Sequence, residues 1–133
     1  MGLEAQVNIV NDDDVIAARQ AGRMLAAETG FPAREQAMLA AVITELARNI
    51  LDHAEGGEIL IRAIEDSGRR GIAVIARDHG PGIPNIKDTV ESSYSVAGGL
   101  GLGLRGVKGL VDSLDIISVP GKGTTVTAKK WQS

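Results

Sequence analysis

The 133-residue chain contains no cysteine, and it has only one phenylalanine, one tyrosine and one tryptophan. The lack of cysteine excludes disulfides, thiolate metal sites and a cysteine nucleophile. Two histidines argue against a histidine-based zinc site. Three aromatic rings are too few for the stacking platforms that bind single-stranded nucleic acid. These absences remove the disulfide-bonded, zinc-dependent and single-strand-binding classes of protein.

Charge and hydropathy narrow the class further. A net charge of −3 and a pI of about 5.3 argue against a general nucleic-acid binder. No run of about 18 apolar residues is present, so the sequence predicts no transmembrane helix and no membrane partner. The start of the chain lacks the basic residues and apolar stretch of a signal peptide. We therefore expect a cytoplasmic protein, with residues 1–133 forming one domain.

Hydrophobic periodicity predicts the element order β-α-α-β-β-α-β-β. The expected ranges are 6–10, 15–28, 33–53, 58–65, 71–77, about 103–113, 114–119 and 124–130. Such an order is typical of an α/β fold, here a two-layer α/β sandwich with a mixed, mostly antiparallel sheet and helices on one face. The polar segment 85–97 is expected to be a mobile lid.

The segment 33–53 is the most informative of these elements. Its apolar positions recur at helical spacing and form one stripe. Glu45 and Asn49 lie together at one edge of this stripe, because they are one helical turn apart. Taken alone, Glu45 is compatible with a surface residue that pairs with Arg48, three positions along the helix.

Glycine is unusually abundant, and eight of the 17 glycines lie between Gly80 and Gly109. The segment 101–103 leads directly into a predicted helix, where glycine allows close backbone approach and a helix N-terminus attracts anions. Residues 101–106 match the pattern G-x-G-x-x-G, but the preceding strand and the later acidic residue of a dinucleotide site are missing. The glycine segment could therefore hold phosphates or serve only as a flexible connector.

Four short motifs occur in order: ELARN at 45–49, DHGPG at 78–82, GLG at 101–103 and GKGTT at 121–125. This set resembles the GHKL superfamily, which has the Bergerat (histidine-kinase-like ATPase) fold, and the resemblance spans 33–130. The chain has no room for a transducer domain or a phosphoacceptor-histidine helix pair. Among the small stand-alone kinases that remain, the sequence is similar to the switch kinases of bacterial stressosomes.

The resemblance implies roles for three residues of the first motif. Glu45 would be the general base for a serine or threonine hydroxyl, since a carboxylate can accept that proton when it is positioned nearby. Asn49 would bind Mg²⁺ through its side-chain oxygen, which suits a hard cation. Arg48 would contact phosphates or a partner, or form a simple ion pair.

The other motifs imply contacts to ATP. Asp78 would accept a hydrogen bond from the adenine amino group, and Gly80 and Gly82 would allow the base to approach closely. Thr124 would support the adenine through a water molecule. The residues expected to hold the phosphates are Gly101, Leu102 and Gly103.

The function implied is a serine/threonine protein kinase that uses Mg-ATP to phosphorylate STAS-domain scaffold and antagonist proteins. The kinase would then be released to bind and activate a downstream effector, such as a metal-dependent protein phosphatase. Two alternatives remain: an anti-sigma factor that binds a sigma factor directly, and a non-catalytic, ATP-gated adaptor. Trp131 is expected to pack at a strand end or to contact a partner.

Overall fold

A computed structural model describes residues 3–80, 103–119 and 121–132. Within these ranges the elements follow the predicted order. They are β1 (Glu4–Ile9), α1 (Asp12–Thr29), α2 (Ala33–His53), β2 (Gly57–Asp66), β3 (Arg69–Asp78), α4 (Gly103–Leu110), β4 (Ser113–Val119) and β5 (Gly123–Trp131). The predicted lid at 85–97 lies outside the described residues.

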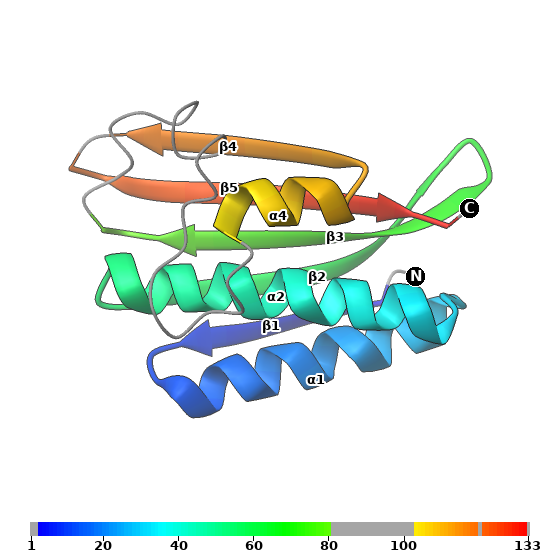
Figure 1. The fold of residues 1–133 in the computed structure, drawn as a ribbon, viewed down its shortest axis with the longest axis horizontal. Helices are drawn as coiled ribbons and strands as arrows, with labels where there is room; N and C mark the ends of the chain where they lie inside the picture. Colours follow the sequence, from blue (N-terminus) through cyan, green and yellow to red (C-terminus); the bar gives the residue numbers. More distant parts are fainter. Residues whose placement is uncertain (1–2, 81–102, 120, 133) are drawn as a thin grey trace.

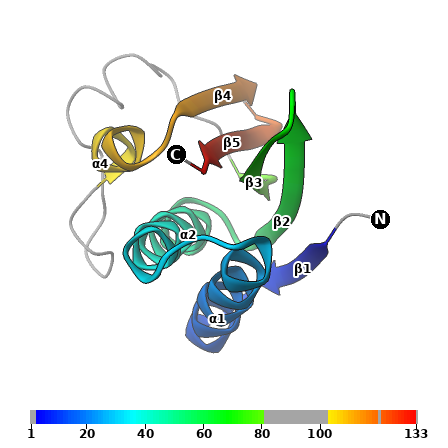
Figure 2. The ribbon, with the colours of Figure 1, turned by 90° about the vertical axis from the view of Figure 1, so that its right-hand side faces the viewer.

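The strands form one five-stranded sheet in the order β1-β2-β3-β5-β4. All four strand pairings are antiparallel. The sheet was expected to be mixed, but the described strands contain no parallel pair. Short turns join β2 to β3 and β4 to β5, which favours antiparallel neighbours. Figures 1 and 2 show the described helices on one face of the sheet, which confirms the two-layer α/β sandwich.

The core lies between this helical layer and the sheet. The predicted apolar stripe of α2 is buried there, and aliphatic side chains of β2 and β3 face it. The principal residues are Leu39, Val42, Ile43, Leu46, Ile50, Ile59, Ile61, Ile72 and Val74. Phe31 is the one aromatic residue among the buried core residues described. Branched aliphatic side chains therefore supply most of the hydrophobic stabilisation.

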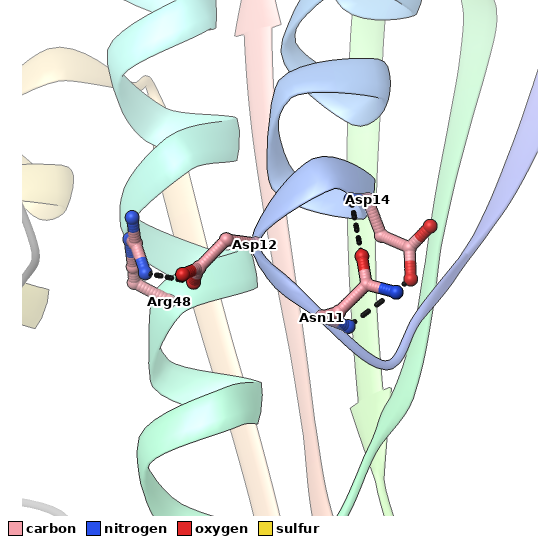
Figure 3. Close-up of polar contacts among 4 residues, drawn as sticks. All are labelled: Asn11, Asp12, Asp14 and Arg48. Carbon is pink, nitrogen blue, oxygen red and sulfur yellow. Dashed lines mark hydrogen bonds and ion pairs between the residues drawn. The ribbon is translucent and has the colours of Figure 1, made fainter.

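α1 begins three residues earlier than predicted because Asn11 caps it. The Asn11 side-chain oxygen accepts a hydrogen bond from the Asp14 backbone N–H at 3.1 Å. In return, the Asp14 carboxylate accepts from the backbone N–H groups of Asn11 and Val10, at 3.1 and 2.8 Å. This reciprocal capping box satisfies donors that the helix itself leaves unpaired (Figure 3).

α4 ends at Leu110, short of the predicted end near residue 113, because β5 engages the residues that follow. The Lys130 ammonium donates to the Leu110 carbonyl at 3.0 Å. The Asp112 backbone N–H donates to the Lys129 carbonyl at 2.9 Å, and its carboxylate accepts from the Trp131 N–H at 2.7 Å. These contacts turn the chain into β4.

The Trp131 side chain packs across the end of the sheet. Trp131 pairs with Gly71 of β3, and a Cβ added to Gly71 would lie 2.7 Å from the indole ring. The missing side chain of Gly71 makes room for the ring, which supports the packing role of Trp131. Among the described helices, none combines the length and hydropathy of a bilayer-crossing segment.

Candidate active site

Glu45 lies in the middle of α2 and is fully buried, so the alternative of an exposed glutamate is wrong. Arg48 pairs instead with Asp12, the first residue of α1, with 2.5 Å between nitrogen and oxygen (Figure 3). This ion pair joins the beginning of α1 to α2, and Arg48 is 28% exposed there. The proposed contact of Arg48 with phosphate or a partner stays a prediction.

Asn49 follows Glu45 by one turn, and its side-chain oxygen is buried. Within the described residues this oxygen has no hydrogen-bond partner. Buried polar atoms in folded proteins are nearly always paired, so this oxygen can accept a water molecule or a bound ion. An amide oxygen is a suitable ligand for Mg²⁺, which prefers oxygen donors. The residue therefore fits the metal that the motif implies.

Asp78 is the last residue of β3 and is held in one orientation by two backbone groups. Its Oδ1 accepts hydrogen bonds from the N–H of Gly80 at 2.9 Å and from the N–H of Thr124 at 3.3 Å. Its second oxygen, Oδ2, accepts no hydrogen bond from the described residues. Because Oδ1 is held by two N–H groups, Oδ2 keeps a fixed position as an acceptor, which suits the amino group of a base.

Two glycines bring Asp78 against its neighbours. A Cβ at Gly80 would lie 2.7 Å from the carbonyl oxygen of His53 and 2.9 Å from Ala54 Cβ, so Gly80 lets the end of β3 contact the end of α2. Gly123 has φ +121°, and its Cβ would lie 2.1 Å from the carbonyl oxygen of Asp78. No role was predicted for Gly123, although its place in the segment GKG at 121–123 was a signal.

A cavity of about 830 Å³ opens where α2 and β3 end. Its size falls in the range of small-molecule sites. Burial lowers the pKa of His53, which lines this cavity, and the nearby carboxylates of Asp52 and Asp78 raise it in part. The net effect is a lowered pKa, which disfavours the charged form of His53. The lining residues are Asp52, His53, Ala54, Glu55, Gly56, His79, Gly80 and Gly121.

The structure thus brings Asp78, Gly80 and Thr124 together at the end of α2, one turn beyond Asn49. Gly103 begins α4. The remaining predicted contacts, Gly82, Gly101 and Leu102, lie outside the described residues. The described part of the site is therefore the part expected to hold adenine and the metal.

Residues 34–132 match the family described as histidine kinase-, DNA gyrase B-, and HSP90-like ATPase. A curated relative from Bacillus subtilis (strain 168), named serine/threonine-protein kinase RsbT, is 46% identical over 131 residues. The alignment covers 98% of both chains. The chain is therefore similar to this kinase along nearly its entire length.

Two solved structures illustrate the similarity in fold. The RsbU and RsbW domains of a Mycobacterium tuberculosis protein match with a TM-score of 0.65 and 20% identity, over 100% of this chain and 33% of that longer chain. The SiaB–SiaC complex of Pseudomonas aeruginosa matches with a TM-score of 0.56 and 11% identity, over 98% and 89% of the two chains. At such low identities these matches show the fold alone.

Proposed function

The chain belongs to the family of histidine kinase-, DNA gyrase B- and HSP90-like ATPases, in which it is an ATP-binding serine/threonine-protein kinase, and we propose that its substrates are STAS-domain scaffold and antagonist proteins. Residues 1–133 act as one catalytic domain in the cytoplasm. After phosphorylation the kinase is released and activates a downstream effector, such as a metal-dependent protein phosphatase. The observation that carries the catalytic part is the orphaned oxygen of Asn49, one turn from the buried Glu45.

The base of ATP is selected at the end of β3. Asp78 is held by two backbone N–H groups, and its second oxygen accepts the hydrogen bond of the adenine amino group. Gly82 allows the base to approach, and Gly80 lets the end of β3 contact the end of α2 beside it. The turn at 101–103 and the N-terminus of α4 bind the phosphates, since a helix N-terminus favours negative charge.

Phosphoryl transfer requires mainly positioning and charge stabilisation, with little covalent chemistry from the protein. When bound, Mg²⁺ supplies positive charge to the phosphate oxygens, and Asn49 contributes one oxygen ligand to it. Glu45 orients the incoming hydroxyl and takes its proton. Glu45 is fully buried, so the hydroxyl can reach it only when the groups that cover and contact it move aside.

The direct test is the intact mass of a STAS-domain protein after incubation with Mg-ATP and the kinase. Wild type is expected to add the mass of one phosphate, and Glu45→Gln to add none while it still binds ATP. Glu35→Gln is the matched control, because Glu35 lies in the first turn of the same helix, about 15 Å along the axis from Glu45.

The outcomes separate the alternatives. No added mass with wild type, despite demonstrated binding of Mg-ATP and of the STAS protein, would refute the substrate proposal and favour the ATP-gated adaptor. Equal phosphorylation by wild type and Glu45→Gln would refute the role of Glu45. Stable co-purification with a sigma factor, without any STAS protein, would favour the anti-sigma function.

A further inference from the structure

Lys130 of β5 is a buried cation that none of the four motifs contains. It is 8% exposed, and its Nζ donates to the carbonyl oxygen of Leu110 at 3.0 Å. We propose that Lys130 is a positioning residue, which holds α4 at its C-terminal end and thereby keeps the N-terminus of that helix in place for the phosphates of ATP. This inference rests on the phosphate site of the proposed function and adds to it a residue from outside the motifs.

The register of the sheet directs Lys130 towards the helices. Lys130 pairs with Ile72 of β3, which is fully buried in the core. Cross-strand partners project from the same face of a sheet, so Lys130 extends into the helical layer. Side chains alternate along a strand, so the neighbouring Lys129 projects from the opposite face. The two adjacent lysines therefore differ in place although they carry the same charge.

The end of a helix is a suitable place for a buried ammonium group. The last carbonyl groups of a helix have no partner within it and carry partial negative charge. Leu110 is the last residue of α4, so Lys130 both pairs with one of these carbonyls and balances its charge. Within the described part of the chain, no carboxylate forms an ion pair with Lys130. The helix end is therefore its polar anchor among the described residues.

α4 needs such a contact because it is weak as an isolated helix. It has eight residues, of which three are glycine. Short helices are marginal in water, and glycine lowers their stability further. Its two most buried side chains, Leu104 and Val107, are three positions apart and form a single line of contact with the core. One line of contact leaves the helix able to tilt, and the bond from Lys130 opposes this motion at Leu110.

A helix is stiff, so its two ends move together. Eight residues span about 12 Å, and a tilt at Leu110 therefore displaces Gly103, the first residue of α4. Hydrogen bonds from a helix N-terminus to phosphate depend on the distance and angle of each donor. β5 carries Thr124 beside Asp78 near its beginning and Lys130 near its end. One strand thus positions both the residues expected to bind adenine and the helix expected to bind phosphates.

The test replaces Lys130 by methionine, which keeps an unbranched side chain and removes the charge and the donors. Lys129→Met is the matched control, because it removes the same charge from the adjacent residue on the other face of β5. Dissociation constants for ATP, ADP and adenosine are measured by calorimetry at one ionic strength. Adenosine has the base and the ribose but no phosphate. Thermal unfolding without a ligand establishes that each variant is folded.

We expect Lys130→Met to weaken the binding of ATP and ADP by about fivefold or more, which is the lower range of coupling between two sites. Adenosine should change by less than about twofold, because it makes no contact with the end of the helix that is displaced. Lys129→Met should leave all three dissociation constants within about twofold of the wild type.

A measurement on the wild type covers the case in which Lys130→Met does not fold. Coupling is reciprocal, so if Lys130 favours phosphate binding, bound phosphates stabilise the contact between Lys130 and Leu110. At equal saturation, ATP should therefore slow hydrogen exchange of the backbone amides in the last turn of α4 more than adenosine does.

The outcomes separate this inference from its premise. Equal weakening of all three ligands by Lys130→Met shows a general structural effect and refutes the inference, as does unchanged binding of ATP. An equally large effect of Lys129→Met also refutes it, because charge alone would explain the loss. If Lys130→Met does not fold, equal hydrogen exchange with ATP and adenosine refutes it. A wild-type protein that binds adenosine as tightly as ATP refutes the proposed phosphate site, and one that binds neither refutes the nucleotide site.

Discussion

The contact between Gly123 and Asp78 predicts a large and specific cost for Gly123→Ala. The new Cβ would lie 2.1 Å from the Asp78 carbonyl oxygen and 2.9 Å from its carbonyl carbon. Both are backbone atoms of β3, which cannot rotate away as a flexible side chain could. The alanine would also have to adopt φ +121°, outside the regions that L-residues favour. Relief of the overlap must therefore displace Asp78.

The magnitude follows from two contributions. Backbone strain at such a φ costs about 1–3 kcal/mol, and the overpacking adds about 1–3 kcal/mol. We expect Gly123→Ala to lower the free energy of unfolding by about 2–6 kcal/mol, the sum of these contributions and a large share of the roughly 5–15 kcal/mol of a typical domain. Gly68→Ala is the matched control, because Gly68 has φ +79° but nothing within 4 Å of the added Cβ. It should cost only about 1–2 kcal/mol.

Urea denaturation and ATP binding are the assays. With a slope near 1.5 kcal/mol per molar urea, Gly123→Ala should lower the midpoint by about 1.3–4 M, and Gly68→Ala by about 0.7–1.3 M. Because Gly123→Ala displaces Asp78, it should also weaken ATP binding under conditions where it is folded, and Gly68→Ala should not. The reasoning fails if the two variants lose equal stability, or if Gly123→Ala binds ATP like wild type.

Three smaller effects are expected. Asn11→Ala removes the cap of α1 and should cost about 1 kcal/mol in urea denaturation; no loss would contradict the role of the capping box. Gly109→Ala, at an exposed position of α4 with nothing within 4 Å, should gain about 0.5–1 kcal/mol and raise Tm by about 3 °C, and a lowered Tm would contradict it. The pKa of His53 is lowered from 6.5, so the unfolded chain binds its proton more readily than the folded one. The contribution of His53 to the free energy of unfolding should therefore be highest above pH 6.5 and fall as the pH drops towards the folded pKa. His53→Gln should reduce this dependence of stability on pH. An unchanged dependence would show that other groups cause it.

Much of the fold could be predicted because the pattern of buried residues is periodic. The helix at 33–53 was correct to the residue, since its stripe runs unbroken from Leu39 to Ile50. Boundaries were less accurate where side chains decide them. The capping box at Asn11 starts α1 early, and the bond from Lys130 to the Leu110 carbonyl ends α4 early. These contacts depend on specific side chains that meet in the folded chain. The periodic pattern of apolar residues does not reveal them.

The candidate site was predictable in composition but not in geometry. The four motifs identified Glu45, Asn49, Asp78 and Thr124, yet the burial of Glu45 contradicts its reading as a surface residue. Register across the sheet could not be read from the sequence, so the pairing that places Thr124 beside Asp78 was not predicted. A motif shows which residue types are close together in the sequence. It does not show which strands pair in the sheet.

The line along which β3 pairs with β5, here called the seam, also constrains how the protein folds. Asp78 and Thr124 lie on opposite sides of this seam and are 46 positions apart in the chain. Each belongs to its own hairpin, β2–β3 or β4–β5, which can form from nearby residues, whereas the seam closes only after a long loop has lost its entropy. Asp78, the acceptor proposed for the base, and Thr124 therefore come together only when the two hairpins dock. If the proposed adenine site is correct, nucleotide binding should report completed tertiary assembly, because a chain with only its hairpins formed would lack that site.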